Sequence, residues 1–139
     1  MARAAARSCP VPLHTMSTIT RYPTPLPAPF SKAVKVDGFL FLSGVLPMDA
    51  QANIVGADIQ EQTRIVLERI ALTLSESGAS MTNVVRATIW LSDLNNFAAF
   101  NAEYSKHFTA GLPARSTVQA VLYKGALIEV EVQAWVGTD

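Results

Sequence analysis

PARSTVQ (residues 113–119) and ALIEVEVQAWV (residues 126–136) are the stretches of this 139-residue sequence that decide its fold. In each, small or apolar residues alternate with polar ones, as in a β-strand that has one face in the core. The polar positions are Arg115, Thr117 and Gln119 in the first stretch, and Glu129, Glu131 and Gln133 in the second. We therefore expect two strands that place an arginine and two carboxylates on the sheet face pointing away from the core.

Further strands are predicted upstream. Residues 33–36 and 39–43 are apolar runs joined by Asp37-Gly38, which is a typical hairpin turn. Residues 84–91 form a third apolar run. Before the hairpin lies an extended lead-in that can be neither helix nor central strand, because prolines alternate through it at Pro23, Pro25, Pro27 and Pro29.

Two helices are also predicted. The first begins at a capping box of Asp58 and Glu61 and ends at Gly78. Its expected buried stripe is Ile59, Thr63, Val66, Ile70 and Leu74. The second is capped by Asp93 or Asn95, ends at Gly111-Leu112-Pro113, and carries the stripe Phe97, Phe100, Tyr104 and Phe108, which we interpret as core packing rather than a cofactor site.

The resulting order is strand, strand, helix, strand, helix, strand, strand. It predicts one α+β domain with a mixed sheet and both helices packed on one face. The other face would carry the polar residues of the last two strands, with Leu127 and Trp135 at its edges. Such a half-polar face suits a symmetric interface between copies of the chain better than bare solvent.

Composition excludes several classes of function. Lysine plus arginine is 11 and aspartate plus glutamate is 11, so the surplus of positive charge that a nucleic-acid binder needs is missing. Cys9 is the sole cysteine, and His14 and His107 are far apart, so we expect no metal site. No stretch is long and apolar enough to cross a membrane, and we expect a cytoplasmic protein.

Residues 1–15 contain Arg3 and Arg7, no acidic residue and no hydrophobic periodicity. We favour the interpretation that they precede the natural start at Met16 or are disordered; the alternative is an organelle transit peptide, which is also arginine-bearing and acid-poor. Either way, the domain is expected to span residues 16–139.

Ser43-Gly44 follows a predicted strand and could suggest a serine nucleophile. Neither histidine is placed to act as its base, so we expect Ser43 to be a hydrogen-bonding residue or simply the end of the strand. Asn101 lies one position past Phe100 on the second helix. It is either a surface residue or a group turned towards a neighbouring cleft.

Arg115 and Glu129 are the remaining candidates. An arginine in this position can hold a carboxylate through two parallel hydrogen bonds. If the last two strands form a hairpin, Glu129 lies opposite Gln119, on the order of 13 Å along the strand from Arg115. One small ligand cannot touch both groups in one chain. The pair is therefore either not a site or part of a site shared between subunits.

At these residues the chain resembles the Rid family, also called YjgF, from Pro27 to Val136. The motifs that carry the resemblance are PAPFS (27–31), LSG (42–44), NVVR (83–86), DLNNF (93–97), FN (100–101), PARS (113–116) and IEVE (128–131). The resemblance implies a homotrimer of a chorismate-mutase-like α+β fold, with clefts at the subunit interfaces.

The resemblance also implies an activity: hydrolysis of 2-imino or enamino acids to 2-keto acids and ammonia, without metal or organic cofactor. By this resemblance Arg115 clamps the substrate carboxylate, Glu129 positions the attacking water, and Ser43, Gly44, Asn101 and Thr117 line the cleft. Two positions depart from the family pattern. Phe30 replaces a common tyrosine, which removes a hydroxyl that could bind substrate, and Thr117 stands where cysteine is frequent.

Alternatives remain open. The chain could be a binding module that holds a keto acid with Arg115 without turning it over. The change to Phe30 favours this alternative, whereas the presence of Glu129 favours an enzyme. It could be a deaminase of a different enamine, such as 2-aminomuconate. A ribonuclease or translation inhibitor is disfavoured by the neutral charge and the lack of a histidine pair.

Overall fold

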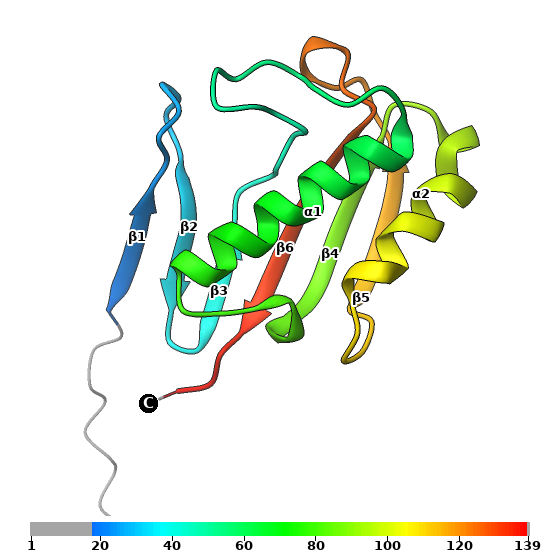
Figure 1. The fold of residues 1–139 in the computed structure, drawn as a ribbon. Helices are drawn as coiled ribbons and strands as arrows, with labels where there is room; N and C mark the ends of the chain where they lie inside the picture. The colour runs from blue at the N-terminus through cyan, green and yellow to red at the C-terminus, as the bar shows by residue number, and fades with distance from the viewer. Residues whose placement is uncertain (1–17, 139) are drawn as a thin grey trace, which may run out of the picture.

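A six-stranded sheet in the order β1-β2-β3-β6-β4-β5 forms one layer of the protein in the computed structural model, which describes residues 18–138 (Figure 1). Strands β4 and β5 are parallel, and every other neighbouring pair is antiparallel. The strands are β1 (Ile19–Pro23), β2 (Ser31–Val36), β3 (Phe39–Leu42), β4 (Val84–Leu91), β5 (Ala114–Gln119) and β6 (Ile128–Trp135).

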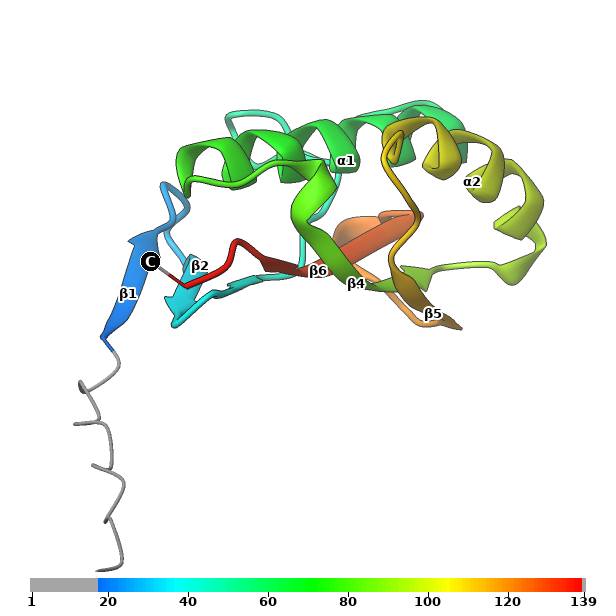
Figure 2. The ribbon, with the colours of Figure 1, turned by 90° about the horizontal axis from the view of Figure 1, so that it is seen from below.

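Helices α1 (Ile59–Glu76) and α2 (Phe97–Tyr104) both lie on one face of this sheet (Figure 2). The predicted α+β class, with a mixed sheet and two helices on one face, is therefore confirmed. Short 3₁₀ turns stand at Met81–Asn83, Leu94–Asn96, Ser105–His107 and Tyr123–Gly125.

The predicted cap and stripe explain why α1 forms. The Asp58 side chain accepts a hydrogen bond from the Glu61 backbone N–H at 2.8 Å, a cap that stabilises a helix by about 1 kcal/mol. The predicted stripe of α1 is buried from Ile59 to Leu74. Gln62, which the periodicity did not single out, is also buried: its amide donates to the Gly56 carbonyl and accepts from the Leu127 N–H, which joins α1 to the residue just before β6.

For the second helix the prediction is partly wrong. Asp93 caps the 3₁₀ turn Leu94–Asn96, and α2 ends at Tyr104, before the predicted end at Gly111-Leu112-Pro113.

The predicted hairpin of the last two strands is wrong. β4 lies between β5 and β6 and pairs with both, so the chain after β5 crosses β4 before it enters β6. Strand alternation shows which residues share a face but not which strand lies alongside. The hairpin at Asp37-Gly38 is confirmed, with Asp37 in the left-handed conformation at φ 52°.

The predicted face of β5 is also wrong. Arg115 is in register with Ala87 and Thr117 with Ile89, and both partners on β4 are buried in the core beneath the helices. Paired residues point to the same side of a sheet, so Arg115 and Thr117 face the helices. On β6 the buried residues are Ile128 and Val130, so Glu129 faces away from the helices, as predicted.

The lead-in was expected to contain no central strand, and the structure adds the edge strand β1 there, which ends at Pro23. An edge position explains this, because proline is tolerated where one side of the strand has no hydrogen-bonding partner. The extension expected over residues 1–15 lies outside the described residues.

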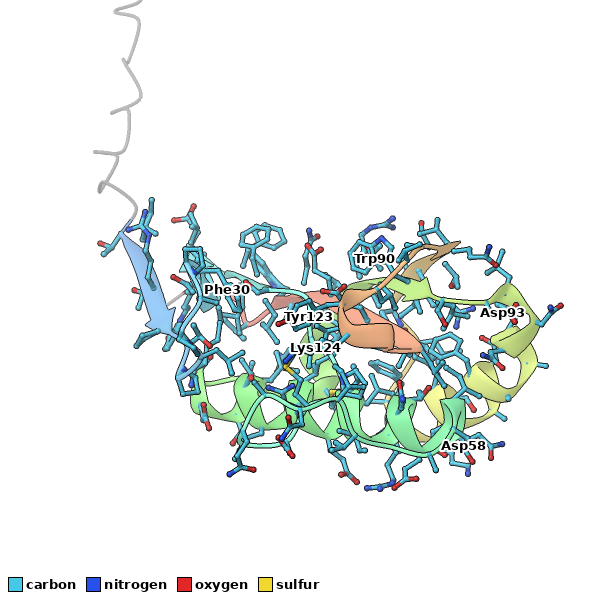
Figure 3. All side chains as sticks on the ribbon, turned by 90° about the horizontal axis from the view of Figure 1, so that it is seen from above. Phe30, Asp58, Trp90, Asp93, Tyr123 and Lys124 are labelled. Atoms are coloured by element: carbon cyan, nitrogen blue, oxygen red, sulfur yellow. The ribbon has the colours of Figure 1, made fainter. Side chains whose placement is uncertain are left out.

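No helix or strand of residues 18–138 covers the sheet face opposite the helices, and this bare face is rich in large side chains. Figure 3 shows Trp90 on this side, while Asp58 lies on the helix side. Phe39 packs against Trp135 at 4.8 Å between ring centroids and against Phe41 at 6.0 Å, and all three are at least 40% exposed. A cluster of exposed aromatic rings of this kind is typical of a surface that is covered by another protein chain.

Candidate functional site

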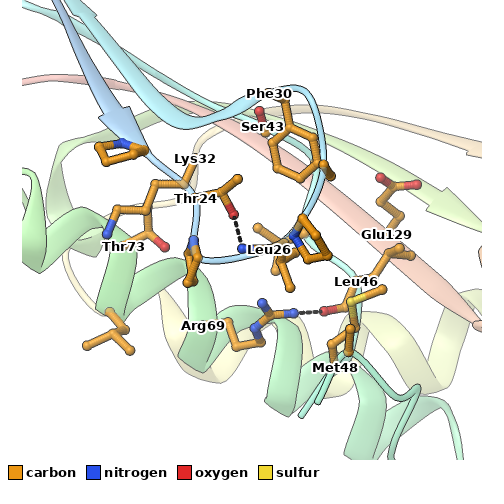
Figure 4. Close-up of a pocket in the computed structure, with 18 of the residues that line it drawn as sticks. Thr24, Leu26, Phe30, Lys32, Ser43, Leu46, Met48, Arg69, Thr73 and Glu129 are labelled. Carbon is orange, nitrogen blue, oxygen red and sulfur yellow. Dashed lines mark hydrogen bonds between the residues drawn. The ribbon is translucent and has the colours of Figure 1, made fainter. Parts of the chain in front are cut away.

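One group of predicted site residues lines a single cavity of about 890 Å³ (Figure 4). Phe30, Ser43, Gly44 and Glu129 all border it. The cavity exists because the chain leaves the sheet at Ser43, at the end of β3, while the 23–30 segment and α1 close it from the other sides.

Ser43 contributes a hydrogen bond rather than a nucleophile. Its Oγ donates to the Ser31 carbonyl at 2.7 Å, which ties the end of β3 to the start of β2. Its hydroxyl proton is thus already engaged with a backbone acceptor. The geometry agrees with the predicted hydrogen-bonding role.

Gly44 and Glu129 are in close contact. A Cβ atom at Gly44 would lie 2.5 Å from the Glu129 Oε1, so only glycine leaves room for this carboxylate position. The backbones are joined just beyond, where the Val45 N–H donates to the Val130 carbonyl at 2.8 Å. Burial, and then the charge of Glu131, raises the pKa of Glu129 above its usual 4.5. A carboxylate with a raised pKa is a stronger base, which suits proton transfer.

Arg115 lies in a different place, inside a ring of aromatic side chains from α2. Its guanidinium carbon is 5.5 Å from the ring centre of Phe97, 5.2 Å from that of Phe100 and 5.0 Å from that of Tyr104. Cation–π contacts of this kind hold the guanidinium in one orientation and leave its N–H donors free for an anion. Phe100, Tyr104 and Phe108 are therefore core, as predicted, whereas Phe97 is 42% exposed and serves as a support for the arginine alone.

Three unpaired polar atoms belong to the same region. Within residues 18–138, the Asn101 Oδ1, the Tyr104 Oη and the Thr117 Oγ1 are buried without a hydrogen-bonding partner. Burial raises the pKa of Tyr104 to about 12, while the charge of Arg115 opposes this shift. The phenol therefore stays protonated and can donate. Buried polar groups are usually hydrogen-bonded, so these three atoms are available to a ligand, a water molecule or a neighbouring chain.

The two groups are far apart within one chain. Through β4, Arg115 is in register with Ala87 and Glu129 with Trp90, so they are separated by two strand spacings and three residues. That corresponds to roughly 14 Å, and the two side chains also point to opposite faces of the sheet. The predicted site residues are thus brought together as two sets, Phe30, Ser43, Gly44 and Glu129 in one and Asn101, Arg115 and Thr117 in the other.

Several further residues of the site were not found from the sequence. Lys32, Arg69 and Tyr123 also line the cavity, and Tyr104 stands over Arg115. Arg69 lies on α1 between the buried positions Leu67 and Ile70. An arginine so close to the buried stripe of a helix could have indicated a charged group that faces a cavity. Tyr123 belongs to a 3₁₀ turn that no periodicity predicts.

Within residues 18–138, no three His, Cys, Asp or Glu side chains are grouped as a bound metal ion would require. In the same part of the chain, neither helix combines the length and the apolar character of a membrane span.

Comparison with solved structures defines the class of protein. The fold matches that of yeast Mmf1 with a TM-score of 0.80 and 35% identity, over 85% of this chain and 98% of that one. It also matches a Rid family protein from Yersinia pestis, with a TM-score of 0.79 and 35% identity, over 86% of this chain and all of that one. The chain is thus an α+β protein of the YjgF fold.

The family follows from the sequence comparison. The family model described as Endoribonuclease L-PSP matches residues 23–136, and the chain belongs to this family, also known as the YjgF or Rid family. A RutC family protein of Pyrococcus abyssi is 44% identical over 115 residues, which is 81% of this chain and 90% of the relative. The goat (Capra hircus) protein named 2-iminobutanoate/2-iminopropanoate deaminase is 40% identical over 108 residues, 76% of this chain and 79% of the relative. The predicted resemblance is confirmed.

Proposed function

We propose that this protein hydrolyses reactive 2-imino acids, and their enamine tautomers, to 2-keto acids and ammonia. The observation that carries the proposal is the division of the predicted site into two incomplete sets. One holds a basic carboxylate beside a cavity, and the other holds a guanidinium with unpaired polar atoms. Neither alone can bind and hydrolyse an imino acid, but together they supply both functions. The name of the goat relative supports the same chemistry.

The two sets meet, in this proposal, across a subunit interface. In a cyclic homotrimer, the Glu129 cavity of one subunit would lie against the Arg115 region of the next. The exposed aromatic cluster of Phe39, Phe41 and Trp135 supports such an assembly, because it offers apolar surface on the face that carries Glu129. The unpaired atoms around Arg115 support it too, because they would find partners there.

The proposed reaction requires little of the protein. Arg115 holds the substrate carboxylate, and this places the imine carbon beside the Glu129 cavity. Glu129 takes a proton from water as the water oxygen adds to the carbon of the C=N bond, and it passes that proton to the imine nitrogen, which gives a carbinolamine. Glu129 then takes the proton of the new hydroxyl group and delivers it to the amine, so the C–N bond breaks as the C=O bond forms, and ammonia and the 2-keto acid leave. The imine carbon is already electrophilic, so orientation and one base supply most of the acceleration.

A non-catalytic role as a keto-acid binder is the second candidate. Phe30 favours it, because the cavity lacks the hydroxyl that a tyrosine would provide at this position. The raised pKa of Glu129 favours catalysis, because it makes the carboxylate a stronger base than an ordinary glutamate, which a binding module does not need.

Ammonia release from 2-iminobutanoate, generated in situ from threonine by a dehydratase, tests the proposal. We expect Arg115→Ala to reduce kcat/KM by at least about a hundredfold. Arg115→Lys should retain only part of the activity, because lysine lacks the planar guanidinium group that binds a carboxylate through two parallel hydrogen bonds. The matched control is Arg64→Ala, which removes an exposed arginine of α1.

Glu129→Gln separates the two candidates. It should lower kcat far more than it weakens the binding of 2-oxobutyrate, since glutamine keeps the shape but cannot act as a base. Wild-type protein that binds 2-oxobutyrate but never accelerates ammonia release would establish the binding module instead.

A further inference from the structure

The cavity beside Glu129 is larger than a short imino acid requires. Its volume of about 890 Å³ lies near the upper end of the ~300–1,000 Å³ range of small-molecule sites. Away from Glu129 the cavity continues towards α1, and apolar side chains of Leu26, Leu46 and Met48 line this part (Figure 4). A substrate held at Glu129 therefore has room for a side chain of several carbons.

Arg69 brings a charge into this apolar part. It reaches from α1 into the cavity, where its Nη1 donates to the Leu46 carbonyl at 2.6 Å (Figure 4). No carboxylate of residues 18–138 forms an ion pair with it. By contrast, Lys32, the other cation of the cavity, is paired with Glu76. Arg69 is thus a cavity-lining cation without a counter-charge in the described chain.

Burial lowers the pKa of Arg69, and no neighbouring charge opposes the effect. The guanidinium remains charged at any physiological pH, and one hydrogen bond uses one of its five N–H donors. Partial burial of a charge without a partner is unfavourable. An anion that entered the cavity would remove this cost and use donors that the protein leaves unpaired.

A purely structural role for Arg69 explains less. The bond to Leu46 holds the loop of residues 44–56 against α1, but a bond to a carbonyl needs one N–H donor and no formal charge. The structural role therefore accounts for one donor and not for the charge.

We infer that Arg69 binds a second acidic group of the substrate, so that the preferred substrates are imino or enamino dicarboxylic acids with an apolar spacer. This inference rests on the proposed function. The first carboxylate would lie at Arg115 of the neighbouring subunit and the reacting carbon at Glu129. The spacer would contact Leu26, Leu46 and Met48, and the terminal carboxylate would reach Arg69.

Two imines of equal chain length test the inference. 2-Iminoadipate and 2-iminohexanoate are made in situ by amino-acid oxidases from 2-aminoadipate and norleucine. The first ends in a carboxylate and the second in a methyl group. Their kcat/KM values are compared in wild type, Arg69→Gln and Arg69→Lys. Arg69→Gln removes the charge and keeps an N–H donor on a shorter side chain, and Arg69→Lys keeps the charge. Arg64→Gln, on the exposed side of α1, is the matched control.

We expect the ratio of kcat/KM for iminoadipate over iminohexanoate to fall about ten- to a hundredfold in Arg69→Gln, the usual effect of losing a hydrogen bond to a charged group. The loss should appear mainly in KM. Arg69→Lys should keep part of the preference, and Arg64→Gln all of it. An unchanged ratio in Arg69→Gln would overturn the inference and leave Arg69 as a support of the loop.

Calorimetric binding of the products separates this inference from the proposed function. 2-Oxoadipate and 2-oxohexanoate are titrated into the same proteins, which needs no turnover. Weaker binding of 2-oxoadipate alone in Arg69→Gln would support the Arg69 subsite even if no imine were hydrolysed. Turnover of iminohexanoate, with equal affinity of both keto acids in all variants, would retain the deaminase and reject the subsite.

Discussion

Glu129 owes its raised pKa to two neighbouring features, its burial beside Gly44 and the charge of Glu131 on the same strand. Both disfavour the ionised form. A base is active only when deprotonated, so a raised pKa moves the acid limb of the activity profile to higher pH. The advantage is greater basicity of the carboxylate near neutral pH. Because Glu131 contributes through charge alone, it offers a way to change the basicity of Glu129 without touching the cavity.

Glu131→Gln should shift the pH profile. Removing the negative charge lowers the pKa of Glu129, so the acid limb of the kcat/KM profile should move to lower pH. The plateau activity should also be lower, because Glu129 becomes a weaker base. Glu131→Asp keeps the charge and is the control. A profile that does not move in the glutamine variant would mean that Glu129 is not the group whose ionisation limits the rate.

Gly44→Ala tests the position of the carboxylate. The added methyl group would lie 2.5 Å from the Glu129 Oε1, so the side chain of Glu129 must move. Since a displaced base loses its alignment with water, we expect kcat to fall by about tenfold or more. The melting temperature should change little, because the displaced atom is the end of a flexible side chain. Full activity in this variant would show that the observed position of the carboxylate is not the working one.

Helix α2 and strand β5 form the second half of the proposed site, since α2 supplies the rings around Arg115 and β5 supplies the arginine. Tyr104 is central here because its ring is packed in the core while its hydroxyl has no partner within residues 18–138. We assign the hydroxyl to the ligand or the neighbouring subunit.

Tyr104→Phe should therefore affect activity more than stability. It keeps the ring contacts with Phe100 and Phe108, at 5.2 and 4.7 Å between centroids, and removes only the hydroxyl. We expect kcat/KM to fall about three- to tenfold, the effect of one neutral hydrogen bond, with the melting temperature unchanged or slightly higher. The reverse pattern, a loss of stability with normal kinetics, would contradict the assignment.

Local signals in the sequence predicted most of the elements. Strand β4 was predicted with its observed bounds, and α1 with its observed cap and stripe, because caps and periodicity act over one or two turns. Strand β1 was missed because an edge strand tolerates the proline that appeared to exclude it.

Which strands lie side by side, and which face of β5 is covered, could not be predicted from local patterns. The even positions of β5 were the apolar ones, so they were assigned to the core. They instead face away from the helices: Val118 is 44% exposed. Arg115 takes the helix side because the rings of α2 accommodate a guanidinium there. The separation of the two site residues was correctly predicted, but for the wrong reason.

The bare face of the sheet connects these local features to the proposed assembly. One chain leaves an aromatic cluster exposed, a carboxylate beside an open cavity, and buried polar atoms without partners. A cyclic trimer would cover the aromatic cluster and bring the carboxylate of one subunit beside the unpaired polar atoms of the next. Each cleft would then take Glu129 from one subunit and Arg115 from its neighbour. The shared cleft is the claim on which the proposed activity depends.

Mixing inactive subunits tests that claim most directly. Arg115→Ala and Glu129→Gln subunits are unfolded together in equal amounts and refolded, beside each parent and the wild type treated in the same way. If clefts are shared, the mixture should recover about a quarter of the wild-type activity on 2-iminobutanoate, because one ordered pair of neighbours in four is intact. A mixture as inactive as its parents, with subunit exchange verified by mass, would place both groups in one subunit's site and contradict the account.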